Sequence, residues 1–217
     1  EPGLRAGDLK YVDLDGDGKI RPTQTADDVK DQVILGNALP RYTYSLRLTA
    51  NYFGFDLSAM FTGVGKQDWY PGSGSYDYWG PYDYSYCSFI PRDFMKNVWS
   101  EANPDSFFPR PRGYMTGGND ELGAANNRYL ESVAYFKLRN LMIGYTFPTK
   151  WMHKIGIQNL RIYFSGDNLF TCTPLRNKYI DPEQAGYASN WRTTGAVTVN
   201  SVYPMNKLYT FGLTLTL

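Results

Sequence analysis

The residues best suited to chemistry form an acidic turn near the start of the sequence. In "DLDGDGKI", Asp13, Asp15 and Asp17 occupy positions 1, 3 and 5 of a calcium-loop pattern, and Gly18 at position 6 permits its sharp bend. Lys19 at position 7 would offer its backbone carbonyl. Carboxylates held close together repel one another unless a cation lies between them. The turn therefore predicts a bound Ca²⁺ or Mg²⁺ ion.

The remainder of the calcium pattern is incomplete. Position 9 is Arg21 and position 12 is Gln24, where a bidentate acidic ligand is expected. Further ligands would have to come from Asp27, Asp28 or water. The alternative is a solvated turn without an ion, because Asp and Gly favour turns in any case.

A second candidate site is the aromatic stretch "DWYPGSGSYDYWGPYDYSYCSF" at residues 68–89. Its rings, interleaved with acidic residues, could stack on sugar rings or on peptide side chains. Two alternatives stay open: the surface binds a partner protein, or the stretch packs on itself as a small aromatic core. A later loop with Asp181 and Glu183 raises the same question. The predicted ligand or partner contacts are Trp69, Tyr70, Tyr76, Tyr78, Trp79, Tyr82, Tyr84 and Trp191.

The composition argues against catalysis and against nucleic-acid binding. His153 is the only histidine, so a Ser/His/Asp triad or a multi-histidine metal site is hard to build. Asp77 and Asp83 could act as paired carboxylates, but nothing fixes their separation. With 22 Lys and Arg against 21 Asp and Glu, the chain has no basic footprint for nucleic acid. The sequence predicts a protein that is not an enzyme.

Five stretches alternate apolar and polar residues with period two, which predicts β-strands. These strands must position the groups described above. They are residues 41–52, 55–63, 132–147, 157–170 and 209–217. Arg47, Asn51, Arg161 and Tyr163 fall on the polar side, where they would line a water-filled lumen. Lys137 and Arg139 share the apolar phase of their stretch, which predicts a β-bulge or a rise above the membrane there. The two cysteines, Cys87 and Cys172, would form one bridge or remain free thiols.

The connections between the stretches alternate in length. Residues 53–54 make a tight hairpin and 148–156 a short turn, whereas about 65–128 and 171–203 are long. Short turns at one end and long loops at the other are typical of transmembrane β-barrels. Since a sheet in hydrocarbon must close on itself, five strands would be part of a larger barrel. The alternative is a soluble sandwich, such as a secreted or surface carbohydrate-binding β-module.

Six ordered segments resemble the C-terminal part of the SusC/RagA family of TonB-dependent outer-membrane transporters. They are "GDLKYVDLDGDGKI", "LGNALPRYTYSLRLTANYFGFDLSAMFTGVG", "YFKLRNLMIGYTFP", "LRIYFSGDNLFT", "YIDPE" and "YTFGLTLTL". The resemblance implies an all-β fold, an antiparallel barrel of about twenty-two strands to which this chain gives the last five. It also implies residence in the Gram-negative outer membrane, in contact with lipid.

Partners and cargo follow from the same resemblance. The remainder of the transporter would supply a plug, upstream strands and the contact with TonB, and a SusD-like surface lipoprotein would act as a lid. The expected cargo is an oligosaccharide or an oligopeptide. The corresponding division of residues 1–217 is an extracellular segment with the acidic turn (1–40), a hairpin (41–64), an extracellular loop (65–128), a hairpin (129–170), an extracellular loop (171–203) and a final strand (204–217).

Overall fold

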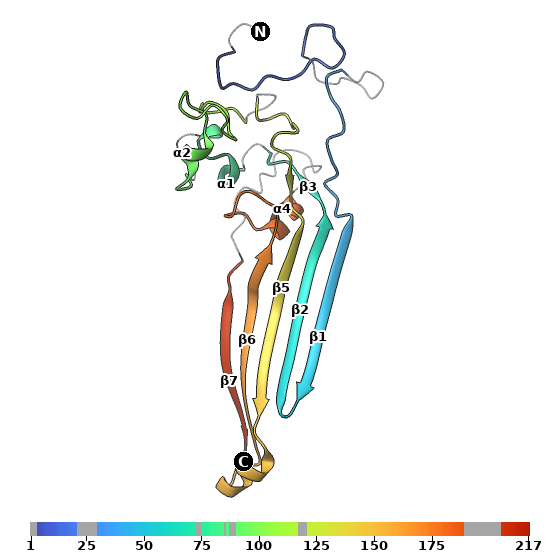
Figure 1. Cartoon of the computed structure of the whole chain (residues 1–217), viewed down its shortest axis with the longest axis vertical. Helices are drawn as coiled ribbons and strands as arrows, with labels where there is room; N and C mark the ends of the chain where they lie inside the picture. The colour runs from blue at the N-terminus through green and yellow to red at the C-terminus, as the bar shows by residue number, and fades with distance from the viewer. Residues whose placement is uncertain are drawn as a thin grey trace. The chain divides into compact units, whose positions relative to one another are not determined.

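The computed structural model describes residues 4–20, 30–72, 75–84, 86, 90–116, 121–188 and 205–217. Figure 1 draws the chain, which divides into two compact units. The strand unit comprises Asn37–Trp69, Glu131–Asn190 and Val202–Leu217. The loop unit comprises Glu1–Gly36, Tyr70–Leu130 and Trp191–Ser201. Among the described residues, no helix has the length and apolar character needed to cross a membrane.

The strand unit is built on one five-stranded antiparallel sheet with the order β1-β2-β5-β6-β7. Its strands are β1 (Tyr42–Tyr52), β2 (Phe55–Lys66), β5 (Tyr135–Thr146), β6 (Asn159–Cys172) and β7 (Leu208–Thr216). The five predicted strands are thereby confirmed, with β2 and β6 extending beyond their expected ends. A separate pair joins β3 (Asp68–Trp69) to β4 (Glu131–Ser132).

The connection between β1 and β2 is the predicted two-residue hairpin. Phe53 and Gly54 both have positive φ, 46° and 87°, as the central residues of a type I′ turn require. A Cβ on Gly54 would lie 2.6 Å from the carbonyl oxygen of Thr146, so a side chain does not fit there. The short connection from β5 to β6 is helical instead, with α3 (Thr149–Met152) followed by the 3₁₀ turn η2 (His153–Ile155).

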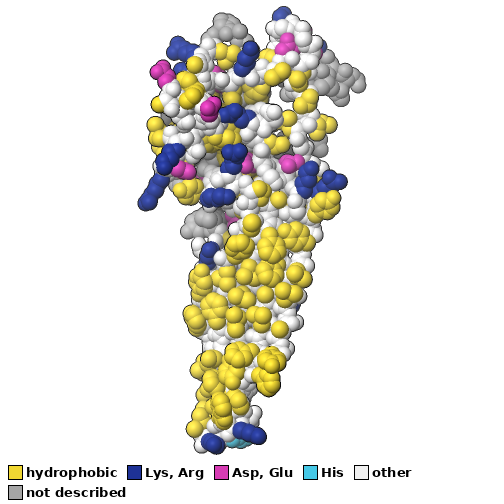
Figure 2. All heavy atoms as spheres, viewed as in Figure 1, with side chains coloured by type: hydrophobic (Ala, Val, Ile, Leu, Met, Phe, Trp, Pro, Cys, Tyr) yellow, Lys and Arg dark blue, Asp and Glu magenta, His cyan; other side chains and the backbone are white. Residues whose placement is uncertain are grey.

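Each face of the five-stranded sheet has its own chemistry. One cross-strand row runs over all five strands as Ala50, Leu57, Ile143, Phe164 and Phe211. These side chains belong to the face called here the apolar face, and Figure 2 shows hydrophobic side chains gathered over the strands. Leu57, Ile143 and Phe211 are exposed in the isolated chain.

The neighbouring row lies on the opposite face, called here the polar face. It consists of Thr49, Ser58, Met142, Ser165 and Thr210, again with one residue from each strand. Since successive residues of a strand point to opposite faces, the two rows define the orientation of the whole sheet.

A β-bulge in β5 confirms the irregularity predicted there. In the pairing with β2, Met60 lies opposite Asn140 and Phe61 opposite Leu138, which leaves Arg139 as the extra residue of β5. Above the bulge, Lys137 is paired with Thr62, a polar-face residue of β2. The added residue therefore moves Lys137 out of the apolar phase that a regular strand would have given it.

The loop unit has a small aromatic core. Trp79 ends the single-turn helix α1 (Tyr76–Trp79), and Tyr82 ends the 3₁₀ turn η1 (Gly80–Tyr82). Both are fully buried, as is Tyr129. Trp79 Nε1 donates to the carbonyl oxygen of Pro71 at 2.9 Å, and the Tyr82 hydroxyl donates to that of Pro109 at 2.6 Å. Because each buried polar group has a partner, these rings can be buried without an unsatisfied donor.

The segment that precedes β1 is joined to the long loop within the loop unit. Arg110 donates from Nε and Nη2 to the two carboxylate oxygens of Asp8, at 3.1 and 3.2 Å. Its backbone amide donates to the carbonyl oxygen of Gly7 at 2.8 Å. Gly7 has φ 87°, and a Cβ there would lie 2.3 Å from the ring of Trp99. Two pieces that the sequence suggested as separate extracellular segments thus fold together.

Candidate functional site

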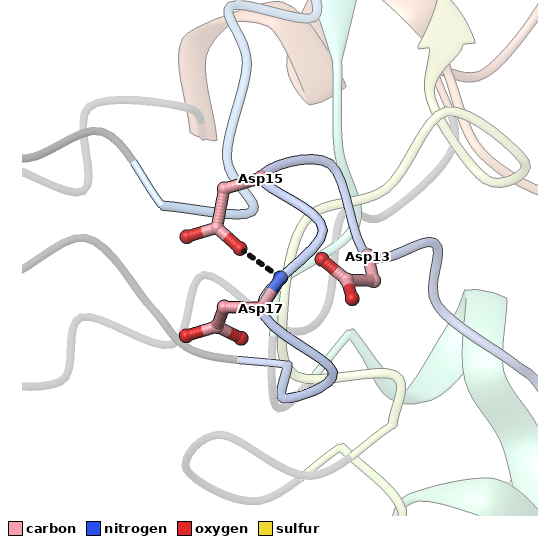
Figure 3. Close-up of side chains that lie close together, drawn as sticks. All are labelled: Asp13, Asp15 and Asp17. Carbon is pink, nitrogen blue, oxygen red and sulfur yellow. Dashed lines mark hydrogen bonds between the residues drawn. The ribbon is translucent and has the colours of Figure 1, made fainter.

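The acidic turn holds its three carboxylates close together. One oxygen from each of Asp13, Asp15 and Asp17 lies within 4.8 Å of the others. Figure 3 shows the three side chains around the same bend. Asp13 accepts hydrogen bonds from the backbone amides of Gly16 at 2.6 Å and Gly18 at 2.8 Å. These bonds fix the bend and the position of the first carboxylate.

Backbone hydrogen bonds also fix the remainder of the turn. The amide of Lys19 donates to Asp17 at 2.8 Å, and the amide of Leu14 donates to Asp31 at 2.8 Å. Asp31 had no sequence signal, because it lies outside the calcium-loop spacing. The predicted positions 9 and 12, Arg21 and Gln24, lie outside the described residues, as do Asp27 and Asp28. Carboxylate oxygens are the donors that Ca²⁺ and Mg²⁺ prefer, so the described groups fit such an ion.

Four of the eight predicted aromatic contacts lie inside the protein. Trp69, Tyr78, Trp79 and Tyr82 are all buried, with exposed fractions of 6% or less. Tyr78, Trp79 and Tyr82 thus have the self-packing arrangement, because each of them contacts the ring of Phe108. Trp69 is buried in the strand unit, and none of these four rings is available to a ligand in this conformation. The side chain of Tyr76 and the whole of Trp191 lie outside the described residues.

Tyr70 is half-buried and braces the end of the long loop. Its hydroxyl lies 2.9 Å from the carbonyl oxygen of Leu122 and 3.0 Å from that of Ala124, and it accepts a hydrogen bond from Asn126 at 3.0 Å. Burial raises the pKa of the Tyr70 hydroxyl well above its usual value, so this group stays protonated and acts as a neutral brace.

Tyr84 is the predicted contact residue that is exposed within the described part of the loop. Its ring centroid lies 5.6 Å from those of Tyr86 and Tyr114. Tyr114 has a positive φ of 62° and is itself exposed. Sequence reasoning missed Tyr114, because a tyrosine after a glycine carries no signal of its backbone conformation. These three tyrosines form the exposed aromatic surface of the loop unit.

The polar face of the sheet carries an ion pair that spans a strand. Arg161 of β6 donates to Asp56 of β2, with Nη2 2.6 Å from Oδ2 and Nε 3.0 Å from Oδ1. The intervening residue on β5 is Gly144, where a Cβ would lie 2.5 Å from Asp56 Oδ1. Tyr163 similarly lies over Gly212 of β7. The absence of a side chain at each glycine lets polar groups meet across the face.

A second ion cluster lies where β5 approaches α4 (Pro182–Ala188). Lys137 Nζ lies 3.1 Å from Asp181 Oδ2 and 2.9 Å from Glu183 Oε2, and Arg139 Nη2 lies 2.5 Å from Glu183 Oε1. The Lys137 side chain is only 1% exposed. Burial by itself would raise the pKa of Glu183, but the hydrogen bonds from Lys137 and Arg139 outweigh it and hold that pKa below its usual value.

The comparisons with known proteins agree with this architecture. No family model matches the chain. The sequence is 28% identical over 220 residues to the TonB-dependent receptor P26 of Formosa agariphila, and 29% identical over 224 residues to the TonB-dependent receptor P3 of the same organism. Each alignment covers 99% of this chain but only 20% and 19% of the relatives. The chain thus spans about one fifth of the length of these relatives.

Solved structures show the same fold. The RagAB peptide importer in its closed-closed state matches with a TM-score of 0.53 and 21% identity, over 92% of this chain and 20% of that one. A further structure of the RagAB peptide transporter matches with a TM-score of 0.53 and 24% identity, over 94% of this chain and 20% of that one.

The two-faced sheet and these relatives point to one class of protein. The chain resembles a segment of the TonB-dependent receptors, which are proteins of the Gram-negative outer membrane. Its fold is similar to that of the RagAB transporter structures, so the segment is SusC/RagA-like.

Proposed function

We propose that this chain forms part of the wall and the extracellular loops of an outer-membrane importer for oligosaccharides or oligopeptides. The observation that carries the proposal is the exposed apolar row from Ala50 to Phe211, with a polar row directly behind it. Such a sheet separates hydrocarbon from a water-filled lumen.

The exposed apolar face argues against the alternative of a secreted carbohydrate-binding module. In a sandwich, a second sheet would cover these side chains. Within the described ranges, Leu46, Phe211 and Leu213 are 51%, 81% and 63% exposed, and the second sheet consists of the two short strands β3 and β4 alone. Lipid is the cover that suits a face of this kind.

The sheet also needs further strands. In the described part of the chain, β1 and β7 each pair with a single neighbour. Free strand edges are not tolerated in hydrocarbon, so strands from the remainder of the transporter would continue the wall into a closed barrel, of about twenty-two strands by the family resemblance. The expected partners are that remainder, TonB through its N-terminal part, and a SusD-like lipoprotein lid.

A bound cation in the acidic turn belongs to the same proposal. The ion would neutralise Asp13, Asp15 and Asp17 and hold the bend in place. Its ligands would be these carboxylates and the backbone carbonyl of Lys19. We assign this ion a structural role and no part in chemistry, because the relatives are receptors and importers.

Paired cysteine variants of the full-length transporter test the orientation of the wall. With Cys87 and Cys172 first changed to serine, Leu213→Cys should react in membranes with a lipid-soluble maleimide and resist a charged one. Thr214→Cys, one residue along on the polar face, should react with the charged reagent. Equal labelling of both positions by the charged reagent would exclude a membrane-facing apolar side.

Uptake of labelled cargo by cells tests the activity itself. The transporter with its lipoprotein partner should accumulate a labelled oligopeptide or oligosaccharide, and accumulation should stop in cells that lack TonB. If neither type of cargo enters in a TonB-dependent way, the import function is wrong for this protein.

A further inference from the structure

We propose that Lys137, Arg139, Asp181 and Glu183 form an ionic latch that fastens α4 to the polar face of the sheet. The loop segment 173–188 is then a shelf inside the pore mouth and not a loop that extends outward. The assignment of the polar face to a pore rests on the proposed function. The latch itself rests only on contacts within the strand unit.

The bulge in β5 supplies the two cations of the latch. In a regular strand Lys137 and Arg139 would share the phase of Leu141 and would face the apolar side. The shift at Arg139 instead pairs Lys137 with Thr62 on the polar face. Both cationic groups then reach α4, which must lie on the same side of the sheet as its partners.

The beginning of α4 supplies the two anions. Asp181 precedes the helix, and its Oδ1 accepts a hydrogen bond from the amide of Glu183 at 2.9 Å. This is the geometry of a helix N-cap, with Pro182 in the first helical position. The same carboxylate accepts from Lys137, at 3.1 Å from Oδ2. The residue that starts the helix is therefore also the residue that fastens it.

The four charges balance, and they are shielded from water. Lys137 is 1% exposed, Asp181 10% and Glu183 15%, while Arg139 at 32% lies at the edge of the cluster. The ring of Tyr135, 5.7 Å from Lys137 Nζ, closes one side. In such an environment, removal of one partner leaves a buried charge without compensation.

Apolar burial and a hydrogen bond also hold the shelf around the latch. Leu175 is fully buried, and Ile180 and Ala185 are 8% and 1% exposed. Thr173 donates through Oγ1 to the carbonyl oxygen of Ala134 at 2.8 Å. This hydrogen bond fixes the beginning of the shelf, and the ion cluster fixes the beginning of α4.

An open cavity of about 440 Å³ lies beside the shelf, between the end of β6 and residues 177–182. Phe170, Tyr179 and the latch residue Asp181 are among its lining residues. A buried ion pair adds little stability compared with apolar packing of similar volume, but removal of one partner is strongly destabilising. Because free volume lies beside it, α4 has space to move once the ion pairs are broken.

Hydrogen exchange on the full-length transporter tests the latch. In Lys137→Met, amides of residues 183–188 should exchange at least tenfold faster than in the wild type, while amides of β6 stay unchanged. Lys137→Arg should restore protection, because it keeps the charge. Lys66→Met, an exposed lysine at the end of β2, serves as the matched control. Unchanged protection of α4 in Lys137→Met, or equal loss of protection in β5 and β6, would overturn the proposal.

A measurement of cargo uptake distinguishes the ionic latch itself from its proposed location in the pore. With the lipoprotein partner present, Lys137→Met should change the uptake rate several-fold relative to Lys66→Met, because the shelf narrows the passage. Release of α4 without a change in uptake would leave the latch but remove its place in the pore. A wild-type transporter that imports no cargo would contradict the proposed function, and the exchange result would still decide the latch.

Discussion

Two kinds of residue determine the local structure of the candidate sites: glycines that leave space for a neighbouring polar group, and an aspartate that fixes a turn. Gly144 and Gly212 are useful because they lack a Cβ, which leaves space for the Asp56–Arg161 pair and for the ring of Tyr163. Asp13 acts through its side chain instead, because its two carboxylate oxygens accept hydrogen bonds from backbone amides and so stabilise the bend. At this scale a single atom decides whether a polar group has a partner.

The acidic turn gives a prediction at the residue scale. Asp15→Asn removes one of three carboxylates, so we expect Ca²⁺ to bind about tenfold more weakly or worse. Isothermal titration of the full-length transporter with Ca²⁺ measures the change. Asp105→Asn, an exposed acidic residue outside the turn, should bind Ca²⁺ like the wild type. If the wild type binds no Ca²⁺ or Mg²⁺, the cation proposal fails.

At the scale of secondary structure, the β-bulge in β5 shows how an irregular strand gains specific partners in another segment. The bulge at Arg139 changes which face Lys137 occupies, and α4 provides the carboxylates that make this change favourable. The tight β1–β2 hairpin is the contrasting case, because Phe53 and Gly54 determine their turn by themselves. The bulge at Arg139 thus has distant partners in Asp181 and Glu183, whereas the Phe53–Gly54 turn is determined by its own two residues.

The attachment of α4 should depend on pH. The pKa of Glu183 is lowered in the folded state, so its contribution is complete above the usual Glu pKa of about 4.3 and is lost as pH falls through the lowered value. We therefore expect protection of the α4 amides, corrected for intrinsic exchange, to fall below about pH 4 while the protection of β6 stays higher. Glu183→Gln should lose this dependence. A wild-type profile identical to that of Glu183→Gln would refute the expectation.

The whole molecule combines a two-faced sheet with a separately folded loop unit. In the proposed transporter one face of the sheet meets lipid and the other meets water, which explains why Phe211 and Leu213 are exposed in the isolated chain. The loop unit instead buries its aromatic rings and fastens the segment before β1 through the Asp8–Arg110 pair. In the proposed transporter, lipid would cover the apolar face of the wall, whereas the loop unit has an internal core of its own.

A charged residue placed on each face in turn tests whether the two faces of the sheet meet different solvents. Phe211→Arg puts a cation in hydrocarbon and should destabilise the inserted transporter by about 2–4 kcal/mol if it lies near the bilayer midplane. Thr210→Arg, on the polar face, should change stability by less than about 1 kcal/mol. Urea-induced unfolding in lipid vesicles measures both. Similar losses for the two variants would show that the faces do not meet different solvents.

The sequence by itself determined the strands, their faces, the hairpin at Phe53 and Gly54, and the position of the bulge. These features are local, because a period of two reports the face of every residue along a strand. Only the tertiary structure decided that Trp79 and Tyr82 lie inside, that Asp8 meets Arg110, and that Lys137 meets Asp181 and Glu183. Each of these features depends on how separate segments of the chain pack together. No spacing of residues in the sequence predicts that packing, so it is determined only in the folded chain.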